Sequence, residues 1–411
     1  MAPGKKLRLF EGFGVELEYM ICRRASLDVL PMAHKLLRAE TGRVRNEVEH
    51  GPLAWSNELV RHVIELKTNG PAPSLDNGLD RLFQEHVGQI NTLLAPLDGC
   101  LMPTAMHPWM NPATETQLWR LGGRRIYQTY DRIFQCNGHG WANLQSVHLN
   151  LPFGDDAEFG RLHAAVRLVL PLIPALAASS PLVEGKPSGL MDSRINFYRR
   201  NQRRVPIIAG EIIPEPVYTR ADYQHQVFQR IYTDMAPHDP EGILRHEWLN
   251  SRGAIARFNR NTIEIRLTDI QECPAADLAL ANLLVAVIRS LVAERWCDHA
   301  TQAAYPTSRL ANLLDDAVCR AEQTQYGPAD YLRLFGLKEN TISGSELLEH
   351  LCDTCLPGDN QHAAHIRRIA RHGVLARRIL RAVADDYRRP RLAAIYRELC
   401  DCLQTGKFFR G

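Results

Sequence analysis

The clearest alternation of polar and apolar residues in this chain lies at residues 14–19, which read Gly-Val-Glu-Leu-Glu-Tyr. Successive side chains of a β-strand point to opposite faces, so Glu16 and Glu18 share one face and the apolar residues share the other. Two carboxylates about 7 Å apart would repel each other and lose hydration in a folded interior. Because hard divalent cations take oxygen ligands, the pair indicates a cation site; a solvated strand with two surface glutamates is the alternative.

Three later stretches repeat this pattern of polar side chains on one strand face. They are Glu65 in 63–68, then Ser146, His148 and Asn150 in 145–152, and finally Glu264, Arg266 and Thr268 in 262–269. A half-exposed edge strand accounts for any one of these stretches, but it accounts poorly for all of them together. Pairing in one antiparallel sheet would give one face packed on helices and one charged face.

Helical periodicity occurs over 75–94 and over 155–178, where Pro171 and Pro174 predict a kink. Beyond Pro274 helical patterns dominate, over 275–296, 310–323, 343–351, 363–384 and 390–403. Strands followed by helices predict an α+β fold. In this fold an antiparallel catalytic sheet would be backed by helices, and the C-terminal part would be helical. We expect a catalytic domain at 1–300 and a helical region at 301–411 packed on it.

The composition is that of a soluble globular protein. The 411 residues are 45% hydrophobic and 23% charged, which is typical of soluble globular chains. The net charge of +3 is too small to indicate binding to nucleic acid or to an anionic membrane surface. No apolar run reaches the length of a membrane span, and the first residues lack the apolar segment of a signal peptide. Ten scattered cysteines fit reduced thiols, so we expect a cytoplasmic protein.

The polar strand face carries a set of residues suited to metal-assisted phosphoryl chemistry. Four glutamates and a histidine of this face suit the binding of two or three Mg²⁺ or Mn²⁺ ions. They are Glu16, Glu18, Glu65, His148 and Glu264. Several divalent ions beside an arginine, here Arg266, form an arrangement that suits a polyphosphate. The chain has no Gly-x-x-x-x-Gly-Lys-Ser/Thr motif, so a nucleotide would not be held by a P-loop.

The same strands carry a resemblance to a known family. Residues 14–18, 63–66, 146–150, 177–181 and 263–269 resemble the motifs of the glutamate–cysteine ligase family, in its carboxylate–amine ligase branch. The loop at 182–194 is similar to the matching loop of plant-type glutamate–cysteine ligases. The resemblance covers roughly residues 10–290, in the same order, and its motifs are specific in combination. It implies a glutamine-synthetase-like catalytic sheet that binds ATP and Mg²⁺.

Residue roles follow from this resemblance position by position. It implies that the metal ligands are Glu16, Glu18, Glu65, His148 and Glu264. Arg266 would contact the nucleotide phosphates or the phosphorylated intermediate, and Arg194 would bind the carboxylates of the acid, unless it is a surface arginine at a loop exit. Further substrate or nucleotide contacts are Asn150, Lys186 and His107, although a plain loop histidine is an equal alternative at position 107. The bacterial branch tends to carry a second histidine where Asn150 stands, which bears on the substrate more than on the metals.

The implied reaction is amide formation through an acyl phosphate. ATP activates a carboxylate, the γ-carboxylate of glutamate by resemblance, and an amine, cysteine by default, displaces phosphate. The alternatives are a different amine in a specialised pathway, a metal-dependent amide hydrolase without ATP, and a binding protein that has lost turnover. Arg194 and Arg266 argue against the hydrolase. The partners we expect are small molecules, and a homodimer is compatible with the sequence.

Two other features allow more than one interpretation. Cys352, Cys355, Cys400 and Cys402 would form a zinc site if their helices met, but ordinary buried cysteines are favoured because Cys-x-Cys is unusual for zinc. The arginine-rich end of the 182–204 loop (Arg199, Arg200, Arg203 and Arg204) favours a mobile lid over merely solvated charge.

Overall fold

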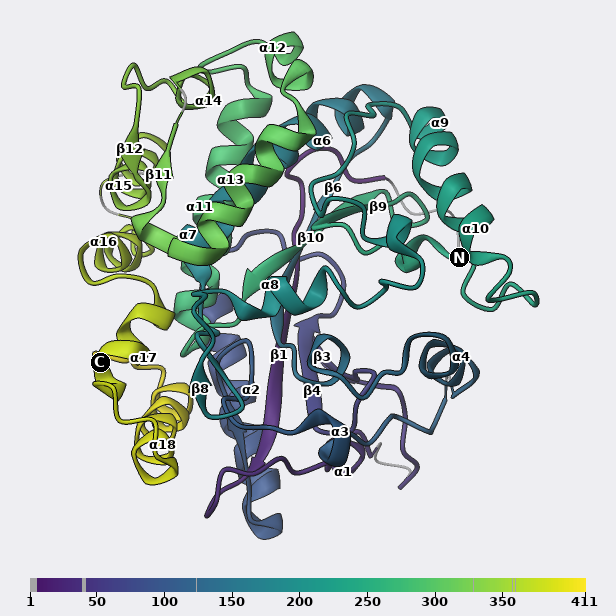
Figure 1. The fold of residues 1–411 in the computed structure, drawn as a ribbon, viewed down its shortest axis with the longest axis vertical. Helices are drawn as coiled ribbons and strands as arrows, with labels where there is room; N and C mark the ends of the chain where they lie inside the picture. The colour runs from purple at the N-terminus through teal and green to yellow at the C-terminus, as the bar shows by residue number, and fades with distance from the viewer. Residues whose placement is uncertain (1–5, 39–41, 123, 328, 357, 359) are drawn as a thin grey trace.

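The computed structural model of the chain describes residues 6–38, 42–122, 124–327, 329–356, 358 and 360–411. Its centre is one antiparallel sheet with the strand order β2-β3-β4-β1-β6-β10-β9, and β5 pairs with the far half of β1 (Figure 1). The strands are β1 (Gly14–Arg23), β2 (Glu47–His50), β3 (Leu53–Asn57), β4 (Val63–Thr68), β5 (Gly99–Met102), β6 (Ser146–Pro152), β9 (Ala254–Arg257) and β10 (Thr262–Asp269).

The register of this sheet brings the predicted polar residues onto one face. Glu16 lies opposite His148, and Glu18 lies opposite Glu65. Asn150 in turn lies opposite Glu264. The prediction that these four strands pair in one antiparallel sheet is therefore confirmed.

A bulge in β10 changes one part of this prediction. Ile265 pairs with Leu149 and Thr268 with Val147, so β10 has one residue more than β6 between these pairs. The extra residue reverses the alternation, which places Asp269 rather than Thr268 on the polar face. The predicted position of Thr268 beside Glu264 is wrong for this reason.

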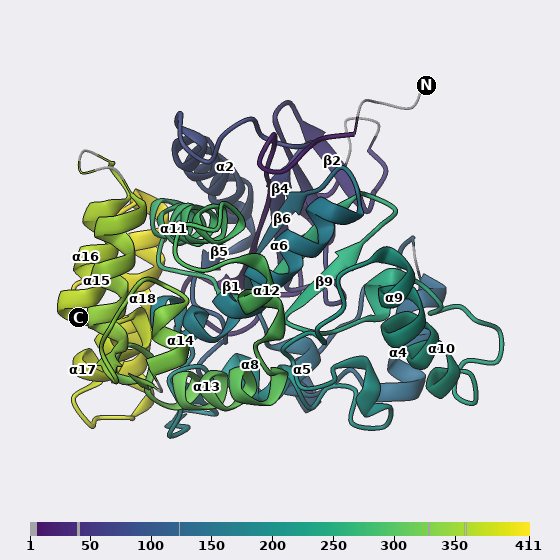
Figure 2. The same ribbon diagram turned by 90° about the horizontal axis from the view of Figure 1, so that it is seen from above.

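Three helices cover the apolar face of the sheet: α2 (Leu79–Leu94), α6 (Asp156–Val169) and α11 (Pro274–Val292). Figure 2 shows α6 and α11 side by side. The kink predicted in the second helix is confirmed, because α6 ends in a 3-10 turn and α7 (Ile173–Ala177) follows it. Buried side chains of the sheet and of these helices form one apolar cluster.

The expectation that no apolar segment is long enough to span a membrane needs a correction for two core segments. Residues 156–177 and 274–292 are long and apolar enough to cross a membrane by composition. Most of their residues are buried inside the protein, against the sheet and against each other. Core helices of globular proteins share this composition, so these two helices give no argument for a membrane span.

Helices predominate after α11, as predicted. They are α12 (His299–Ala304), α13 (Thr307–Arg320), α14 (Ala329–Arg333), α15 (Gly344–Cys355), α16 (Ala363–His372), α17 (Leu375–Val383) and α18 (Arg389–Thr405). The single helix predicted at 363–384 is two helices, because Gly373 adopts a positive φ of 84° that ends α16. α15 and α16 pack on α11, whereas α18 packs on α2 and β5.

The segment predicted as a loop at 182–204 contains regular structure. β7 (Leu182–Val183) and β8 (Lys186–Pro187) form a hairpin in which Glu184 and Gly185 both have positive φ, as a type I′ turn requires. α8 (Ser193–Tyr198) follows, capped by the Asp192 side chain. The remaining elements are α1 (Ala33–Leu36), α3 (Pro112–Glu115), α4 (Arg124–Phe134), α5 (His139–Ala142), α9 (Arg220–Tyr223), α10 (Gln229–Met235), β11 (Gln325–Tyr326) and β12 (Ile342–Ser343).

Candidate functional site

His148 lies at the centre of the polar face and joins the two glutamates of β1. Its Nδ1 lies 2.9 Å from Glu16 Oε2 and its Nε2 lies 3.9 Å from Glu18 Oε1. Asn150 donates from Nδ2 to the other oxygen of Glu16 at 3.2 Å. Glu18 is further held by the backbone N–H and the hydroxyl of Ser146, at 2.7 Å and 2.9 Å. Neighbouring strands thus fix these carboxylates close together.

The carboxylates form two groups that share one residue. The potential ligand atoms of Glu16, Glu65 and His148 lie within 4.8 Å of one another, and so do those of Glu18, Glu58 and Glu65. Glu65 belongs to both groups and is held by the Ser56 hydroxyl at 2.5 Å. These spacings suit oxygen ligands around two adjacent divalent cations. The chemistry of the donor set therefore fits the expected metals.

Glu58 is the member of this set that the sequence did not reveal. It lies between the end of β3 and the start of β4, so it takes no part in the alternation of either strand. The only sequence signal is its place seven residues before Glu65, on the approach to the same strand.

The protonation of these groups reflects their mutual repulsion. Burial and the charge of Glu16 raise the pKa of Glu65 to about 7. Burial and the charges of Glu18 and Glu65 raise the pKa of Glu58 well above its ordinary value. Burial opposes the charged form of His148, but the hydrogen bond to Glu16 and the charge of Glu18 raise its pKa to about 8. A bound divalent cation would relieve this repulsion and favour the ionised carboxylates.

Glu264 lies beside these two groups but is paired with arginines. Arg257 Nη1 donates to one of its oxygens at 2.8 Å and Arg266 Nε donates to the other at 2.5 Å. Burial raises the pKa of Glu264, but the charges of Arg266, His148 and Arg257 outweigh burial and lower it to about 2. A metal at Glu264 would have to compete with these two guanidinium groups. Arg257, on β9, is a second residue that the sequence analysis missed.

Arg194 is a buried residue of α8 that reaches the bulged end of β10. Its Nε donates to Asp269 at 2.5 Å and its Nη1 donates to the backbone carbonyl of Arg266 at 3.2 Å. The Ser179 N–H and the Ser180 hydroxyl hold the other oxygen of Asp269. Nη2 of Arg194 is buried and has no partner among the described residues. The guanidinium is thus fixed beside Arg266 with one nitrogen available.

Two predicted binding residues lie apart from this set of contacts. His107 is buried, with Nε2 at 2.8 Å from the Leu27 carbonyl and its ring against Trp109. Lys186 is an exposed residue of the β7–β8 hairpin. The contacts described for these side chains do not include the carboxylate groups.

The polar face opens into a cavity of about 550 Å³ at the Gly14 end of β1. Its wall includes Glu16 and Asn150 from the polar face together with the cations Lys67 and Arg260. Gly14 is required here because a Cβ at this position would lie 2.9 Å from the Cβ of Asn150. The close approach of β1 and β6 therefore shapes the entrance to the site.

The cysteines and the arginine-rich segment occupy other parts of the fold. Cys352 and Cys355 lie on α15, whereas Cys400 and Cys402 lie on α18. The metal-binding groups found in the described part of the chain contain no cysteine. In the arginine-rich segment, Arg199 pairs with Asp315 at 2.5 Å.

Comparison with known proteins identifies the family. The model for glutamate–cysteine ligase family 2 (GCS2) matches residues 12–398. The chain belongs to this family. An uncharacterized protein of Archaeoglobus fulgidus is 38% identical over 282 residues, covering 68% of this chain and 75% of that protein. A putative glutamate–cysteine ligase 2 of Bradyrhizobium diazoefficiens is 25% identical over 389 residues, covering 91% of this chain and 80% of that protein.

Solved structures share the fold at low sequence identity. The glutamate–cysteine ligase of Francisella tularensis in complex with AMP aligns with a TM-score of 0.61 at 13% identity, over 97% of this chain and 90% of that chain. A bifunctional glutathione synthetase of Pasteurella multocida aligns with a TM-score of 0.62 at 15% identity, over 97% of this chain and 53% of that chain. The family match confirms the predicted family and enzyme class, an ATP-dependent ligase. These solved structures confirm the fold class.

Proposed function

We propose that this member of glutamate–cysteine ligase family 2 uses ATP and Mg²⁺ to join the γ-carboxylate of glutamate to an amine, with cysteine as the first amine to test. One observation carries the proposal. Two groups of potential metal ligands share Glu65, and Arg266 lies on the same polar face, where it is bound to Glu264. Family membership supports the ligase chemistry, and the printed names of the relatives supply the substrates to be tested.

The metal sites would use the two groups that share Glu65. One ion would be held by Glu16, Glu65 and His148, and a second by Glu18, Glu58 and Glu65. Divalent cations in such positions neutralise the charge that develops on a transferring phosphoryl group. Glu264 would join them only if its contacts with Arg257 and Arg266 loosened.

The nucleotide would enter from the cavity at the Gly14 end of β1. Its phosphates would lie over Glu16, Asn150 and Lys67, whose Nζ lies 3.2 Å from Glu65, and its ribose and base would lie near Arg260. The bacterial relatives that tend to carry histidine at position 150 would place a metal ligand or a cation there. Asn150 instead donates a neutral hydrogen bond to Glu16, which orients that carboxylate.

The acid substrate would be bound by Arg194. Asp269 and the Arg266 carbonyl fix two of its guanidinium nitrogens, and the unpartnered Nη2 would donate to a substrate carboxylate. A fixed guanidinium loses little conformational entropy on binding, so it orients the acid at low cost.

The reaction would then proceed in two displacements. A carboxylate oxygen of the acid attacks the γ-phosphorus of ATP, and the bond between this phosphorus and the β–γ bridging oxygen breaks to release ADP. Arg266 stabilises the negative charge on the transferring group. The amine nitrogen attacks the carbonyl carbon of the acyl phosphate, the carbon–oxygen bond to phosphate breaks, and the departing phosphate takes up the proton lost by the amine.

A hydroxylamine trap tests this proposal. With glutamate, ATP and Mg²⁺ but no amine, we expect little product until hydroxylamine is added, after which hydroxamate accumulates in proportion to ADP. Steady cleavage of amides without nucleotide would instead support the hydrolase. Measuring ADP release across a panel of amines, with cysteine included, then identifies the second substrate, because only an accepted amine raises the rate.

A further inference from the structure

Positive charge is concentrated toward one end of this chain. Residues 363–411 hold 12 Lys and Arg residues against 4 Asp and Glu residues, a net charge of +8. Because the whole chain carries +3, residues 1–362 carry −5. A surplus of this size on α16, α17, α18 and the residues that follow creates a local field that attracts anions.

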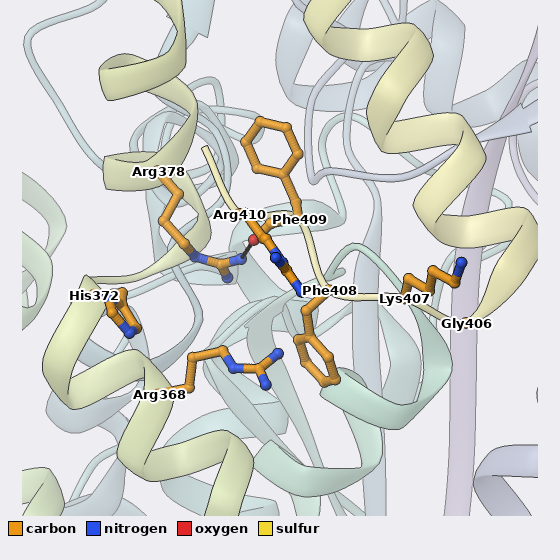
Figure 3. Close-up of a pocket in the computed structure, with 8 residues that line it drawn as sticks. All are labelled: Arg368, His372, Arg378, Gly406, Lys407, Phe408, Phe409 and Arg410. Carbon is orange, nitrogen blue, oxygen red and sulfur yellow. Dashed lines mark hydrogen bonds between the residues drawn. The ribbon is translucent and has the colours of Figure 1, made fainter.

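Part of this charge lines a cavity of about 660 Å³ between α16, α17 and residues 406–410. None of the described residues that line it is acidic, and its basic residues are Arg368, His372, Arg378, Lys407 and Arg410. Figure 3 shows the guanidinium groups of Arg368, Arg378 and Arg410, which come from three different segments, pointing toward the middle of the cavity. The volume is in the range of small-molecule sites.

Two arginines of the same helices that do not line the cavity have carboxylate partners. On α16, Arg367 pairs with Asp353 at 2.9 Å. On α17, Arg377 pairs with Glu322 at 2.8 Å. The charges of these two arginines are therefore compensated by carboxylates.

Of the three cavity arginines, Arg378 also has a carboxylate partner, Glu272 at 2.5 Å, but among the described residues the other two do not. Within the part of the chain that the structure describes, Arg368 and Arg410 have no carboxylate partner. Arg368 lies over the ring of Phe408 at 4.5 Å, which supports the guanidinium plane and leaves its N–H groups available. Arg378 donates to the Phe409 carbonyl at 2.6 Å and so holds residues 406–410 against α17. The cavity thus has a fixed rim and two uncompensated cations.

We propose that this cavity is a second ligand site, which binds a small molecule carrying at least two phosphate groups. A guanidinium binds phosphate oxygens in bidentate fashion, and two guanidinium groups from different segments can each take one phosphate. Inorganic pyrophosphate and a nucleoside diphosphate offer the same chemistry. None of the lining residues belongs to the strands of the catalytic face, so the inference is independent of the proposed reaction.

Calorimetric titration with pyrophosphate, and separately with ADP, tests the site. The titrations are run in EDTA, which removes the divalent cations that phosphates would need at the catalytic carboxylates. Hydrogen–deuterium exchange locates the bound ligand. The cavity variant is Arg368→Gln/Arg410→Gln, and the matched control is Arg391→Gln/Arg397→Gln. The control removes the same charge from exposed arginines of α18 that donate only to backbone carbonyls.

We expect pyrophosphate to slow exchange in peptides covering residues 364–372 and 406–410. The cavity variant should weaken binding by about tenfold or more and the control by less than about twofold, because only the former loses two charge-assisted contacts. Arg368→Lys, which keeps the charge but not the fork, should give an intermediate loss. Tighter binding of ADP assigns a nucleotide, and equal binding assigns the phosphate groups alone.

Three results would overturn the proposal. Equal losses in the two double variants would mean that net charge alone attracts the ligand. Protection confined to 14–18 and 58–65 would move the ligand to the catalytic face. A lack of measurable binding at millimolar pyrophosphate would leave the cavity without this ligand.

Discussion

The three guanidinium nitrogens of Arg194 have different surroundings. Nε pairs with Asp269, Nη1 donates to a backbone carbonyl, and Nη2 has no partner among the described residues. With an exposed fraction of 2%, the residue is not a surface arginine at a loop exit, so that alternative is wrong. Burial of an unpaired donor is costly, which is the physical reason to expect a substrate group there.

Replacing Arg194 by lysine tests whether its guanidinium binds the acid substrate. Lysine keeps the charge but cannot pair with Asp269 and a substrate carboxylate through one planar fork. Losing one charge-assisted contact of about 1.5–3 kcal/mol lowers kcat/KM for the acid about ten- to hundredfold, with the KM for ATP nearly unchanged. Steady-state kinetics with each substrate varied in turn measures both constants. Equal losses of kcat/KM for the acid and for ATP would instead indicate that Arg194 contacts the phosphates. The exposed Arg388→Lys serves as the control.

Glu58 gives a second prediction at this scale. Glu58→Gln removes one ligand charge and relieves repulsion with Glu18 and Glu65, so activity should fall about a hundredfold or more while thermal stability in EDTA holds or rises. Mg²⁺ titrations of activity and thermal unfolding without metal measure the two effects. Wild-type activity with an unaltered Mg²⁺ requirement would remove Glu58 from the metal set. The exposed Glu49→Gln on β2 is the matched control.

Single residues also show how far the sequence could predict the site. Alternation was sufficient for Glu16, Glu18, Glu65 and His148, because strand geometry fixes the face of every second residue. It failed for Glu58, which precedes its strand and follows no period. Distances between side chains of different strands are set by register, which one sequence does not contain.

At the scale of elements, local irregularities separate the prediction from the structure. The bulge in β10 inserts one residue, and Asp269 takes the face that Thr268 was predicted to have. A positive φ at Gly373 divides one predicted helix into α16 and α17. The long helices over 75–94 and 275–296 were predicted correctly because their periodic patterns extend over several turns.

A buried ion pair connects two of these elements. Arg378 of α17 pairs at 2.5 Å with Glu272, which follows β10 and precedes α11. Arg378→Met should destabilise the protein by about 3–5 kcal/mol, because it leaves a buried carboxylate without its partner. Arg378→Met/Glu272→Met should recover most of this loss. Chemical denaturation measures both variants, and additive losses in the double variant would contradict the pairing.

At the scale of the whole molecule, the carboxylates and His148 should make the stability of the fold depend on pH and on added metal. The pKa of Glu65 is raised to about 7 and that of His148 to about 8, so both groups hold protons more tightly in the folded protein. Their contribution to the free energy of unfolding is complete below the pKa values that the two groups have in the unfolded chain. It is lost as the pH rises through about 7 and 8. Without metal, the melting temperature should therefore fall between about pH 5 and 8.

Mg²⁺ should reverse this fall, because a cation stabilises the ionised carboxylates of the folded state. Calorimetric scans at pH 5, 6, 7 and 8, with EDTA and with Mg²⁺, measure the effect. Glu65→Gln removes one of the two titrating groups and should flatten the metal-free profile. A metal-free profile that rises over this range would contradict the assigned protonation states.

The strand order also determines when the polar face can form during synthesis. β1 begins at Gly14, but β6 pairs with it only after residue 150, and β10 completes the face near residue 269. Contacts that close such long loops form slowly, and until then β1 or β6 has an unpaired edge. A chain released before β10 would expose the β6 edge, where strands of other chains can add. Truncation near residue 250 should therefore yield aggregates rather than a smaller domain, whereas the complete sheet protects its own interior strands.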